Sequence, residues 1–201
     1  MTDNIHNHEG TERQKNGITS IDRLDVNLVF DALKLKKGDV FADIGCGAGD
    51  YSFKASELVG SSGLVYALDQ WKEIEDRINI KASESKIKNI KAITSDLKFL
   101  PFNDNSCDFC FISMVLHGFD LSKHGESLFK EFHRILKPRG KLAIIEIKKE
   151  ETLNYSDYKQ VGSLLMPFRI ESSSPKKDSD YVISIYKIDT NKVFPANIFK
   201  F

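Results

Sequence analysis

The stretch VFADIGCGAGD, residues 40–50, is the strongest indication of the fold in this sequence. An apolar run over 40–44 enters a loop with glycine at every second position, Gly45, Gly47 and Gly49, and a helix-like segment begins directly after it. Glycine lets the backbone turn tightly and approach a ligand closely, and the following helix offers free N–H groups and the positive end of its dipole. The stretch therefore predicts a strand, a ligand-binding turn and a helix, with room for a carboxylate at the helix N-terminus.

Strand-like and helix-like segments alternate after this stretch. The expected elements are a helix over 51–59, a strand over 64–68, a helix over 71–82, strands over 90–94 and 109–113, a helix with the apolar stripe Leu128, Phe129, Phe132, Ile135 and Leu136, and a strand over 142–147. Weaker patterns predict a short helix near 155–165 and a hairpin of strands around 168–170 and 181–188. The alternation predicts the α/β class: a doubly wound, mostly parallel, Rossmann-like sheet with helices on both faces.

The segment before the glycine loop predicts one further helix. Four apolar residues recur at helical spacing after Ser20, which can cap a helix: Ile21, Leu24, Leu28 and Leu33. Residues 1–20 are polar and predict a flexible or ligand-ordered arm that could cover a site. We therefore expect an arm over 1–20 and one domain over 21–201, with a cofactor-binding half over about 38–115 and a C-terminal half over about 116–201.

Composition excludes several classes of function. Lysine plus arginine and aspartate plus glutamate number 29 each, and the resulting net charge of zero argues against a dedicated nucleic-acid binder. The longest nearly apolar run, 109–116, is too short to span a bilayer, and the polar start is unlike a signal peptide, so we expect a cytoplasmic protein. No set of cysteines or histidines completes a metal site around His6 and His8. Cys107 and Cys110 are three apart in a strand and should point to opposite faces, which disfavours a redox pair.

The spacing of the glycines and the position of an acid narrow the ligand. A dinucleotide fingerprint is Gly-x-Gly-x-x-Gly, whereas here Asp50 stands at the third glycine position, where it would repel a pyrophosphate. Asp69 ends the second strand about 20 residues later, where an acid can accept both hydroxyls of a ribose. The alternative that Asp69 caps the next helix stays open.

These residues together resemble the class I S-adenosylmethionine-dependent methyltransferases over about residues 21–150. Asp43 and the three glycines are similar to the family's first motif, and Asp69 to its ribose-binding acid. The pair Asp96-Leu97 resembles the aspartate and apolar residue that flank the adenine. LPFNDNSCD, residues 100–108, and LKPRGKL, residues 136–142, resemble the stretches that lead into the fourth and fifth strands.

The resemblance implies a seven-stranded sheet in the order 3-2-1-4-5-7-6, with only the seventh strand antiparallel, and S-adenosylmethionine as cofactor. The implied cofactor-binding residues are Asp43, Gly45, Cys46, Gly47, Gly49, Asp69, Gln70, Asp96, Leu97, Ser113 and Met114. The amino-acid sequence of these motifs most resembles the branch with quinone-biosynthesis and other small-molecule methyltransferases, which implies methyl transfer to a small-molecule acceptor. Arg139 stands where many relatives have glycine, and we expect Gly140 to take the positive φ there.

Four further residues carry hypotheses. His117 follows the fourth strand and is the candidate general base, with a polar wall of the cofactor pocket as the alternative. Glu146, near the end of the fifth strand, is a substrate-side candidate because a carboxylate there needs a partner. Trp71 either covers the adenine or anchors its helix, and the anchor is favoured. His133 lies off the apolar stripe, so we expect it in water.

Two other functions remain open. A nicotinamide-dependent oxidoreductase shares the strand, loop, helix and acid, although the glycine spacing and the Asp96 region disfavour it. A non-catalytic module that binds the cofactor or a partner protein is the other, because catalysis in this fold needs few dedicated residues. The acceptor and the oligomeric state stay undetermined by the sequence.

Overall fold

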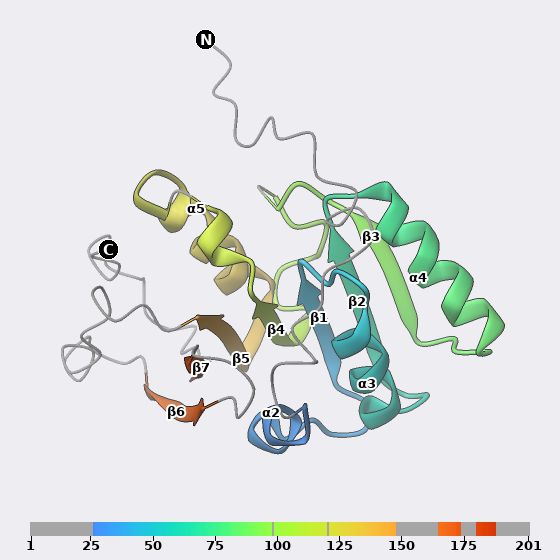
Figure 1. The fold of residues 1–201 in the computed structure, drawn as a ribbon, viewed down its shortest axis with the longest axis horizontal. Coiled ribbons are helices and arrows are strands. Elements are labelled where there is room, and N and C mark those ends of the chain that lie inside the picture. Colours follow the sequence, from blue (N-terminus) through green and yellow to red (C-terminus); the bar gives the residue numbers. More distant parts are fainter. Residues whose placement is uncertain (1–25, 98, 120, 148–164, 174–179, 188–201) are drawn as a thin grey trace, which may run out of the picture.

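A computed structural model describes residues 26–97, 99–119, 121–147, 165–173 and 180–187 (Figure 1). The helices are α2 (Val26–Leu33), α3 (Asp50–Val59), α4 (Lys72–Glu84) and α5 (Leu121–Ile135), with a short 3-10 helix, η1, at Leu116–Gly118. The strands are β1 (Val40–Ile44), β2 (Leu64–Asp69), β3 (Ile90–Thr94), β4 (Cys107–Ser113), β5 (Leu136–Ile147), β6 (Leu165–Ser173) and β7 (Asp180–Lys187).

The strands form one sheet in the order β3-β2-β1-β4-β5-β7-β6. Strands β1 to β5 pair in parallel, with Phe41 of β1 opposite both Val65 of β2 and Phe109 of β4. Strand β7 runs antiparallel to β5 and to β6. The predicted fold class, the parallel core and the strand order are thus confirmed.

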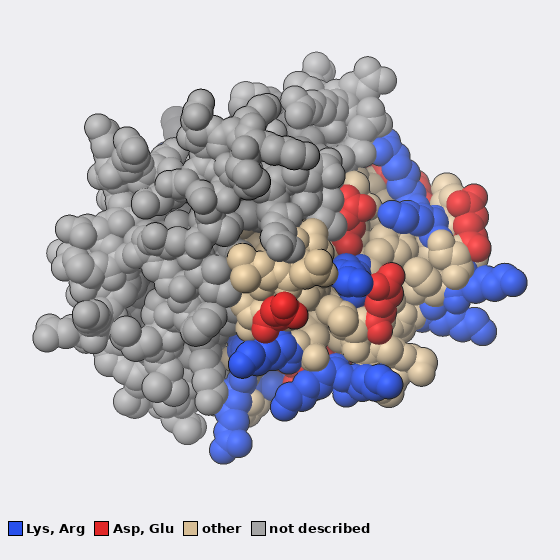
Figure 2. All heavy atoms as spheres, turned by 60° about the horizontal axis from the view of Figure 1, so that its bottom comes forward, with Lys and Arg blue, Asp and Glu red and all other residues tan. Residues whose placement is uncertain are grey.

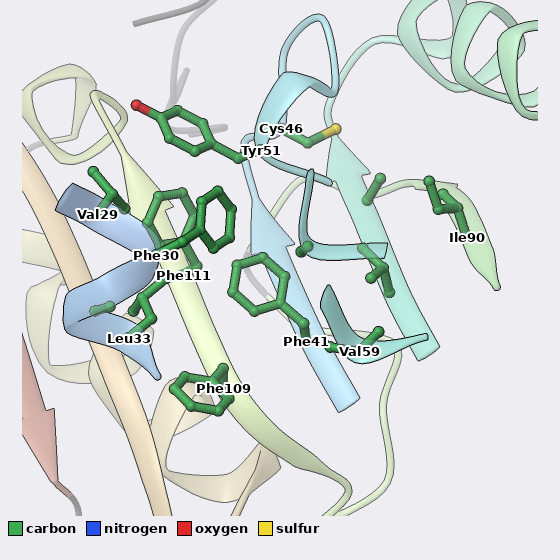
Figure 3. Packing of buried hydrophobic residues seen from close by; sticks show 14 of the residues in the cluster. Val29, Phe30, Leu33, Phe41, Cys46, Tyr51, Val59, Ile90, Phe109 and Phe111 are labelled. Carbon is green, nitrogen blue, oxygen red and sulfur yellow. The ribbon is translucent and has the colours of Figure 1, made fainter. Parts of the chain in front are cut away.

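Helices cover both faces of this sheet, and each face has its own hydrophobic core. The first core lies under α2, α3 and α4, and the second lies under α5 and the loop over 95–106. Aromatic rings fill the centre of the first core: the ring centroids of Phe111 and Tyr51 are 4.9 Å apart, and those of Phe111 and Phe41 are 5.5 Å apart (Figure 3). Strand residues alternate between the two cores, so β1 is rigidly held from both sides.

The pairing of β4 with β5 differs from the prediction in where β5 begins and in its register. Strand β5 begins at Leu136 and not at Leu142, and its register with β4 shifts between Cys107 and Phe109. The step from Leu136 to Lys141 in β5 is longer than the facing step from Cys107 to Phe109 in β4, so the extra residues lie in β5, and the alternation of β4 is interrupted at this point. Cys107 and Cys110 therefore both pack in the second core, so the prediction that they point to opposite faces is wrong. Burial raises the pKa of the Cys107 thiol to about 11.

The turn inside β5 also differs from prediction. Arg139 takes the positive φ, 69°, whereas Gly140 has no positive φ. Gly140 is required for space instead, because a Cβ there would lie 2.9 Å from the backbone oxygen of Lys137. The prediction that Gly140 takes the positive φ is therefore wrong.

Two smaller expectations are corrected and others fall outside the described residues. The buried face of α2 consists of Val29, Phe30 and Leu33, whereas Leu28 is half-buried. His133 is half-buried and not in water, and loss of solvent lowers the pKa of its imidazole. The arm, Ile21, Leu24 and the helix expected near 155–165 lie outside the described residues, except that Leu165 belongs to β6.

The described surface carries charges of both signs. Figure 2 shows Lys and Arg side chains interspersed with Asp and Glu on the described part of one face. Within the described ranges, no helix is long and apolar enough to cross a bilayer.

Candidate functional site

The carboxyl ends of the parallel strands meet at one edge of the sheet, and short hydrogen bonds tie their loops together. The amides of Gly45 and Cys46 each donate to the Leu68 carbonyl at 2.8 Å, which joins the loop after β1 to the end of β2. The amide of Ser95 donates to the Asp69 carbonyl at 2.8 Å, which joins the loop after β3 to the same place. The predicted cofactor residues of three strands therefore share one edge, where ligands bind in open α/β sheets.

The glycine loop has a backbone that other residues would strain. Gly45, Gly47 and Gly49 have φ of 73°, 53° and 79°. A Cβ on Gly45 would lie 2.3 Å from a methyl carbon of Val115, so this position also has no room for a side chain. Gly49 is the left-handed N-cap of α3, whose first turn follows directly. The loop thus brings backbone and helix N-terminus to the sheet edge as the sequence predicted.

Asp69 connects this loop to the start of α4. One carboxylate oxygen accepts from the Gly47 amide at 3.0 Å and the other from the Trp71 amide at 3.3 Å. Burial raises the pKa of this carboxyl, and the hydrogen bonds from the backbone of Gly47 and Trp71 oppose the shift. The helix-cap alternative explains the contact with Trp71 but not the contact with the glycine loop.

Asp43 is a buried acid directly behind the loop. Its side chain is 2% exposed, and the Ser52 hydroxyl donates to it at 2.6 Å. Burial raises its pKa to about 7, with further contributions from the negative charges of Asp69 and Asp50. A carboxyl in such surroundings gains from any cation held at the edge of the sheet.

The pair Asp96-Leu97 is divided between solvent and core. Asp96 is exposed, whereas Leu97 is 6% exposed and packs in the second core with φ of 62°. The Ser95 hydroxyl accepts from the Leu97 amide at 3.3 Å. Leu97 therefore fixes the backbone from which Asp96 projects.

The remaining predicted residues lie at or just beyond the same strand ends. Met114 is half-buried against the first core with φ of 58°, and its amide donates to the Ile145 carbonyl at 2.8 Å. Ser113 is half-buried, Gln70 is exposed, and burial raises the pKa of the Cys46 thiol. The backbone of His117 lies in η1, directly after β4, and the backbone of Glu146 pairs with Val182 of β7. The side chains of His117 and Glu146 lie outside the described part of the structure.

A hollow of about 340 Å³ opens beside the glycine loop. Its lining consists of Gly47 and Ala48 from the loop and five residues of α4: Ile74, Arg77, Ile78, Lys81 and Glu84. It shares Gly47 with the predicted site, whereas no sequence pattern predicted that α4 would line it. Among the residues that the structure describes, no group of three or more metal-ligating side chains is present.

Comparison with known proteins decides the family. A family described as a methyltransferase domain matches residues 42–144, which include the glycine loop, Asp69 and Asp96. The chain belongs to this methyltransferase family. The matched range begins within β1 and ends within β5, so it reaches all five parallel strands.

Individual members of the methyltransferase family show the same relationship. A demethylmenaquinone methyltransferase from Staphylococcus epidermidis is 34% identical over 143 residues, 70% of this chain and 55% of that protein. The chloroplastic 2-phytyl-1,4-beta-naphthoquinone methyltransferase of Arabidopsis thaliana is 38% identical over 133 residues, 63% of this chain and 49% of that protein. The chain thus spans about half the length of these two relatives. A crystal structure of a SAM-dependent methyltransferase from Aquifex aeolicus shares the fold, with a TM-score of 0.63, 24% identity, and coverage of 85% of this chain and 94% of that one.

Several residues that build the site were not found from the sequence. Ser52 was expected in a helix but not as the partner of Asp43, and Val115 was not expected to limit Gly45. The left-handed backbone of Leu97 and Met114 could not be predicted from residue type, because this conformation is common for glycine and, less often, asparagine and aspartate, but not for leucine or methionine. Trp71 is half-buried and packs against the first core, as expected of a helix anchor, and cover of the adenine stays the alternative.

Proposed function

We propose that this chain transfers a methyl group from S-adenosylmethionine to a small-molecule acceptor. The observation that carries the proposal is the direct contact between the glycine loop and Asp69, in which the Gly47 amide donates to the carboxylate at 3.0 Å. Because the two are in contact, one ligand can reach both the proposed carboxylate-binding turn and the proposed ribose-binding acid, and membership of the methyltransferase family supports the same ligand.

The residues present fit this cofactor. Asp43 and Asp69 are acids whose charged forms burial disfavours, and a ligand with a sulfonium and an ammonium group would stabilise both. The loop over Gly45–Gly49 and the start of α3 would hold the methionine carboxylate, because amide N–H groups and the helix dipole favour an anion. Asp69 would accept the ribose hydroxyls, and Asp96 the exocyclic amine of the adenine.

The bound cofactor supplies the reactive methyl group on its sulfonium sulfur. The residues of this chain then have to orient the acceptor in line and to exclude water, and orientation alone is worth about 7–11 kcal/mol. His117 is the proposed base where an acceptor must lose a proton, and a polar pocket wall is its alternative role. Glu146 on β5 is the second proposed residue of the acceptor side, and Ser113 and Met114 at the end of β4 are proposed to contact the cofactor.

The acceptor class that we favour is a quinone-type ring. The two named relatives act, by their names, on demethylmenaquinone and on a phytyl naphthoquinone. Their similarity to this chain extends over 143 and 133 residues, and residues 148–164, which follow β5, lie outside the described structure. The small-molecule acceptor, a site without nucleic acid and a cytoplasmic location stay predictions.

A thermal-shift series tests the cofactor without a known acceptor. A ligand that binds the folded state alone stabilises it by about 2.7 kcal/mol at roughly 100 times its dissociation constant. S-adenosylhomocysteine should therefore raise the melting temperature, and NAD should leave it unchanged. Asp69→Ala should lower the affinity for S-adenosylhomocysteine at least about tenfold, because it removes a charged acceptor.

The matched control is Asp76→Ala on α4, whose carboxylate is 57% exposed and pairs with Lys72 at 2.8 Å. This variant should respond to S-adenosylhomocysteine like the unmodified protein. A melting temperature that NAD raises and S-adenosylhomocysteine does not would overturn the proposed function. Release of S-adenosylhomocysteine from S-adenosylmethionine in the presence of a reduced demethylnaphthoquinone would then identify the acceptor class.

A further inference from the structure

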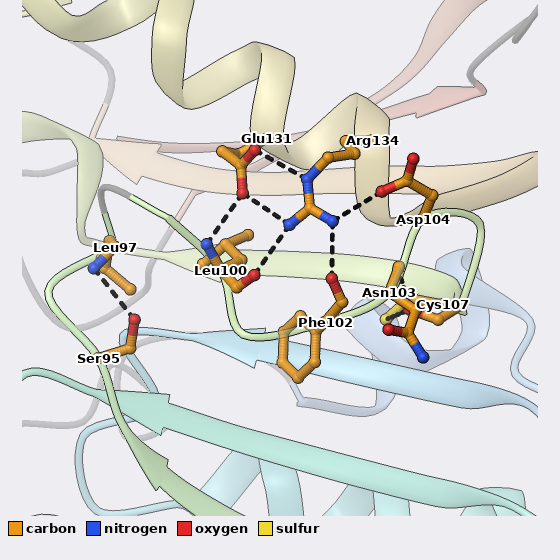
Figure 4. A network of polar contacts seen from close by, with 10 residues as sticks. Ser95, Leu97, Leu100, Phe102, Asn103, Asp104, Cys107, Glu131 and Arg134 are labelled. Carbon is orange, nitrogen blue, oxygen red and sulfur yellow. Dashed lines mark hydrogen bonds and ion pairs between the residues drawn. The ribbon is translucent and has the colours of Figure 1, made fainter.

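We propose that Glu131 and Arg134 of α5 position the loop that carries Asp96, and thereby set the preference of the site for adenine without touching the cofactor. This inference rests on the proposed function and assigns two positioning residues to the same site. Its basis is a network of hydrogen bonds that joins α5 to the backbone of the loop over 95–106 (Figure 4).

The loop spans the gap between β3 and β4 with neither helix nor strand in its described residues, so its backbone groups need partners from elsewhere. Arg134 supplies two of them: its Nη2 donates to the Leu100 carbonyl at 2.8 Å and its Nη1 to the Phe102 carbonyl at 2.6 Å. Glu131 supplies a third, because its Oε2 accepts from the Leu100 amide at 2.9 Å. Both backbone groups of Leu100 are therefore bound by one turn of α5.

The two side chains hold each other in place. The Nε and Nη2 atoms of Arg134 each lie 2.8 Å from an oxygen of Glu131, which makes a two-point pair. Arg134 also donates to Asp104 at 2.9 Å, and its guanidinium lies 4.8 Å from the centre of the Phe99 ring. The pair lowers the pKa of the Glu131 carboxyl, so the carboxylate stays charged. A planar guanidinium can bind all of these groups at once, and a lysine ammonium cannot.

The network lies close enough to Asp96 to control it. The loop is fixed on one side by the Ser95 amide, which donates to the Asp69 carbonyl at 2.8 Å. It is fixed on the other side at Leu100, which is fully buried and held by Glu131 and Arg134. Asp96 is exposed and lies between these two anchors, next to Leu97, whose side chain packs in the second core, so the backbone at Asp96 is held from both directions along the chain. The anchor at Ser95 bonds the loop to Asp69, the proposed ribose-binding acid, and the anchor at Leu100 bonds it to α5.

Arg134→Lys separates this role from a merely structural one. The variant keeps the positive charge but loses the planar guanidinium, so the Leu100 and Phe102 carbonyls should lose their donors. The loop should then move, and with it the carboxylate of Asp96 that is proposed to face the adenine amine. Binding is measured by calorimetry with S-adenosylhomocysteine and with S-inosylhomocysteine, in which a ring carbonyl replaces the exocyclic amine. We expect affinity for the adenine compound to fall about tenfold, as for one charge-assisted hydrogen bond, and affinity for the inosine compound to change much less.

The matched control is Lys137→Gln, which removes an ion pair of 2.7 Å with Asp108 at the opposite end of β4. It should lower the melting temperature and leave the preference for adenine intact. Glu131→Gln gives the same test in a second variant should Arg134→Lys not fold, and it should reduce the preference in the same direction. In an Asp96→Ala background, Arg134→Lys should cause no further loss of preference, because the two residues act in series.

The outcomes separate this inference from the proposed function. An unmodified protein that does not bind S-adenosylhomocysteine overturns the proposed function. An unmodified protein that prefers adenine, together with Arg134→Lys and Glu131→Gln variants that keep this preference, overturns the positioning role alone. A loss of affinity that is equal for both ligands also overturns it, since a general weakening of the fold would produce that result.

Discussion

Asp43 shows how a single residue couples the fold to the site. It belongs to β1, the middle one of the five parallel strands, and its carboxyl lies in surroundings that favour the protonated form. In the unfolded chain this group ionises near its ordinary pKa of 3.8, and in the folded protein near 7. Between these values the folded protein holds a proton that the unfolded chain has released.

This difference predicts how stability depends on pH. Raising the pH from about 4 to about 7 should lower the free energy of unfolding through Asp43, by about 1.4 kcal/mol for each pKa unit of difference. Asp43→Asn removes the titration, and Ser52 can still donate to the amide oxygen. Urea denaturation at a series of pH values should therefore show the variant gaining stability relative to the unmodified protein across this window. A difference between the two proteins that is constant from pH 4 to pH 8 would contradict the shifted pKa.

Ser52→Ala tests the direction in which the hydrogen bond from Ser52 shifts the pKa of Asp43. It removes the hydrogen bond that favours the ionised form, so the window in which stability falls should extend to higher pH. At the residue scale, the sequence identified Asp43 through a motif but could not predict its pKa, because the pKa depends on burial and on Asp69 and Asp50 nearby.

At the scale of elements, the turn inside β5 has a left-handed backbone at Arg139, a residue type that rarely adopts it, and not at the neighbouring Gly140. Arg139 has φ of 69° and an exposed side chain, whereas the neighbouring Gly140 is packed against Lys137 and Leu136. A left-handed backbone costs a residue with a Cβ about 1–2 kcal/mol. This cost stays in the native state, since no described contact of the exposed side chain offsets it.

Arg139→Gly should therefore raise the free energy of unfolding by up to about 1 kcal/mol, once the greater freedom of glycine in the unfolded chain is subtracted. Arg139→Ala is the matched control, because it removes the same side chain and keeps the strain. Chemical denaturation of both variants separates the two effects. Equal stability of the glycine and alanine variants would show that the backbone at 139 is not strained.

The elements that followed from the sequence are those with a strong local period. The strand over 90–94 was predicted at its observed bounds, and the helix over 51–59 and the strand over 64–68 lie within one residue of theirs. The register shift between β4 and β5 and the early start of β5 were not predictable, because each depends on how the two strands pair. The same holds for Glu131 and Arg134, whose partners lie about thirty residues away in the chain.

At the scale of the whole molecule, the two edges of the sheet have different tasks. The proposed cofactor residues Gly47, Asp69 and Asp96 lie at the carboxyl ends of the strands, where loops meet a ligand. Motif order along the chain predicted this edge. The opposite edge is held by Asp108, whose Oδ2 accepts from the Val40 amide at 2.8 Å and from the Lys137 ammonium at 2.7 Å. One carboxylate thus joins the starts of β1, β4 and β5.

Stability and cofactor binding should therefore respond to different acids. Asp108→Ala leaves the Val40 amide and the Lys137 ammonium without this partner, and loss of a charge-assisted hydrogen bond costs about 1.5–3 kcal/mol. We expect this variant to unfold at lower denaturant concentration while its affinity for S-adenosylhomocysteine, measured well below its melting temperature, changes less than about twofold. Asp69→Ala should show the reverse, with weak binding and a nearly unchanged free energy of unfolding, because the burial that raises the pKa of this carboxyl offsets the hydrogen bonds that it accepts from Gly47 and Trp71. Asp108→Asn controls for shape and should lie between Asp108→Ala and the unmodified protein in stability. If Asp108→Ala lowers affinity as strongly as Asp69→Ala does, the edges are coupled through β4, and the division of tasks between them is wrong.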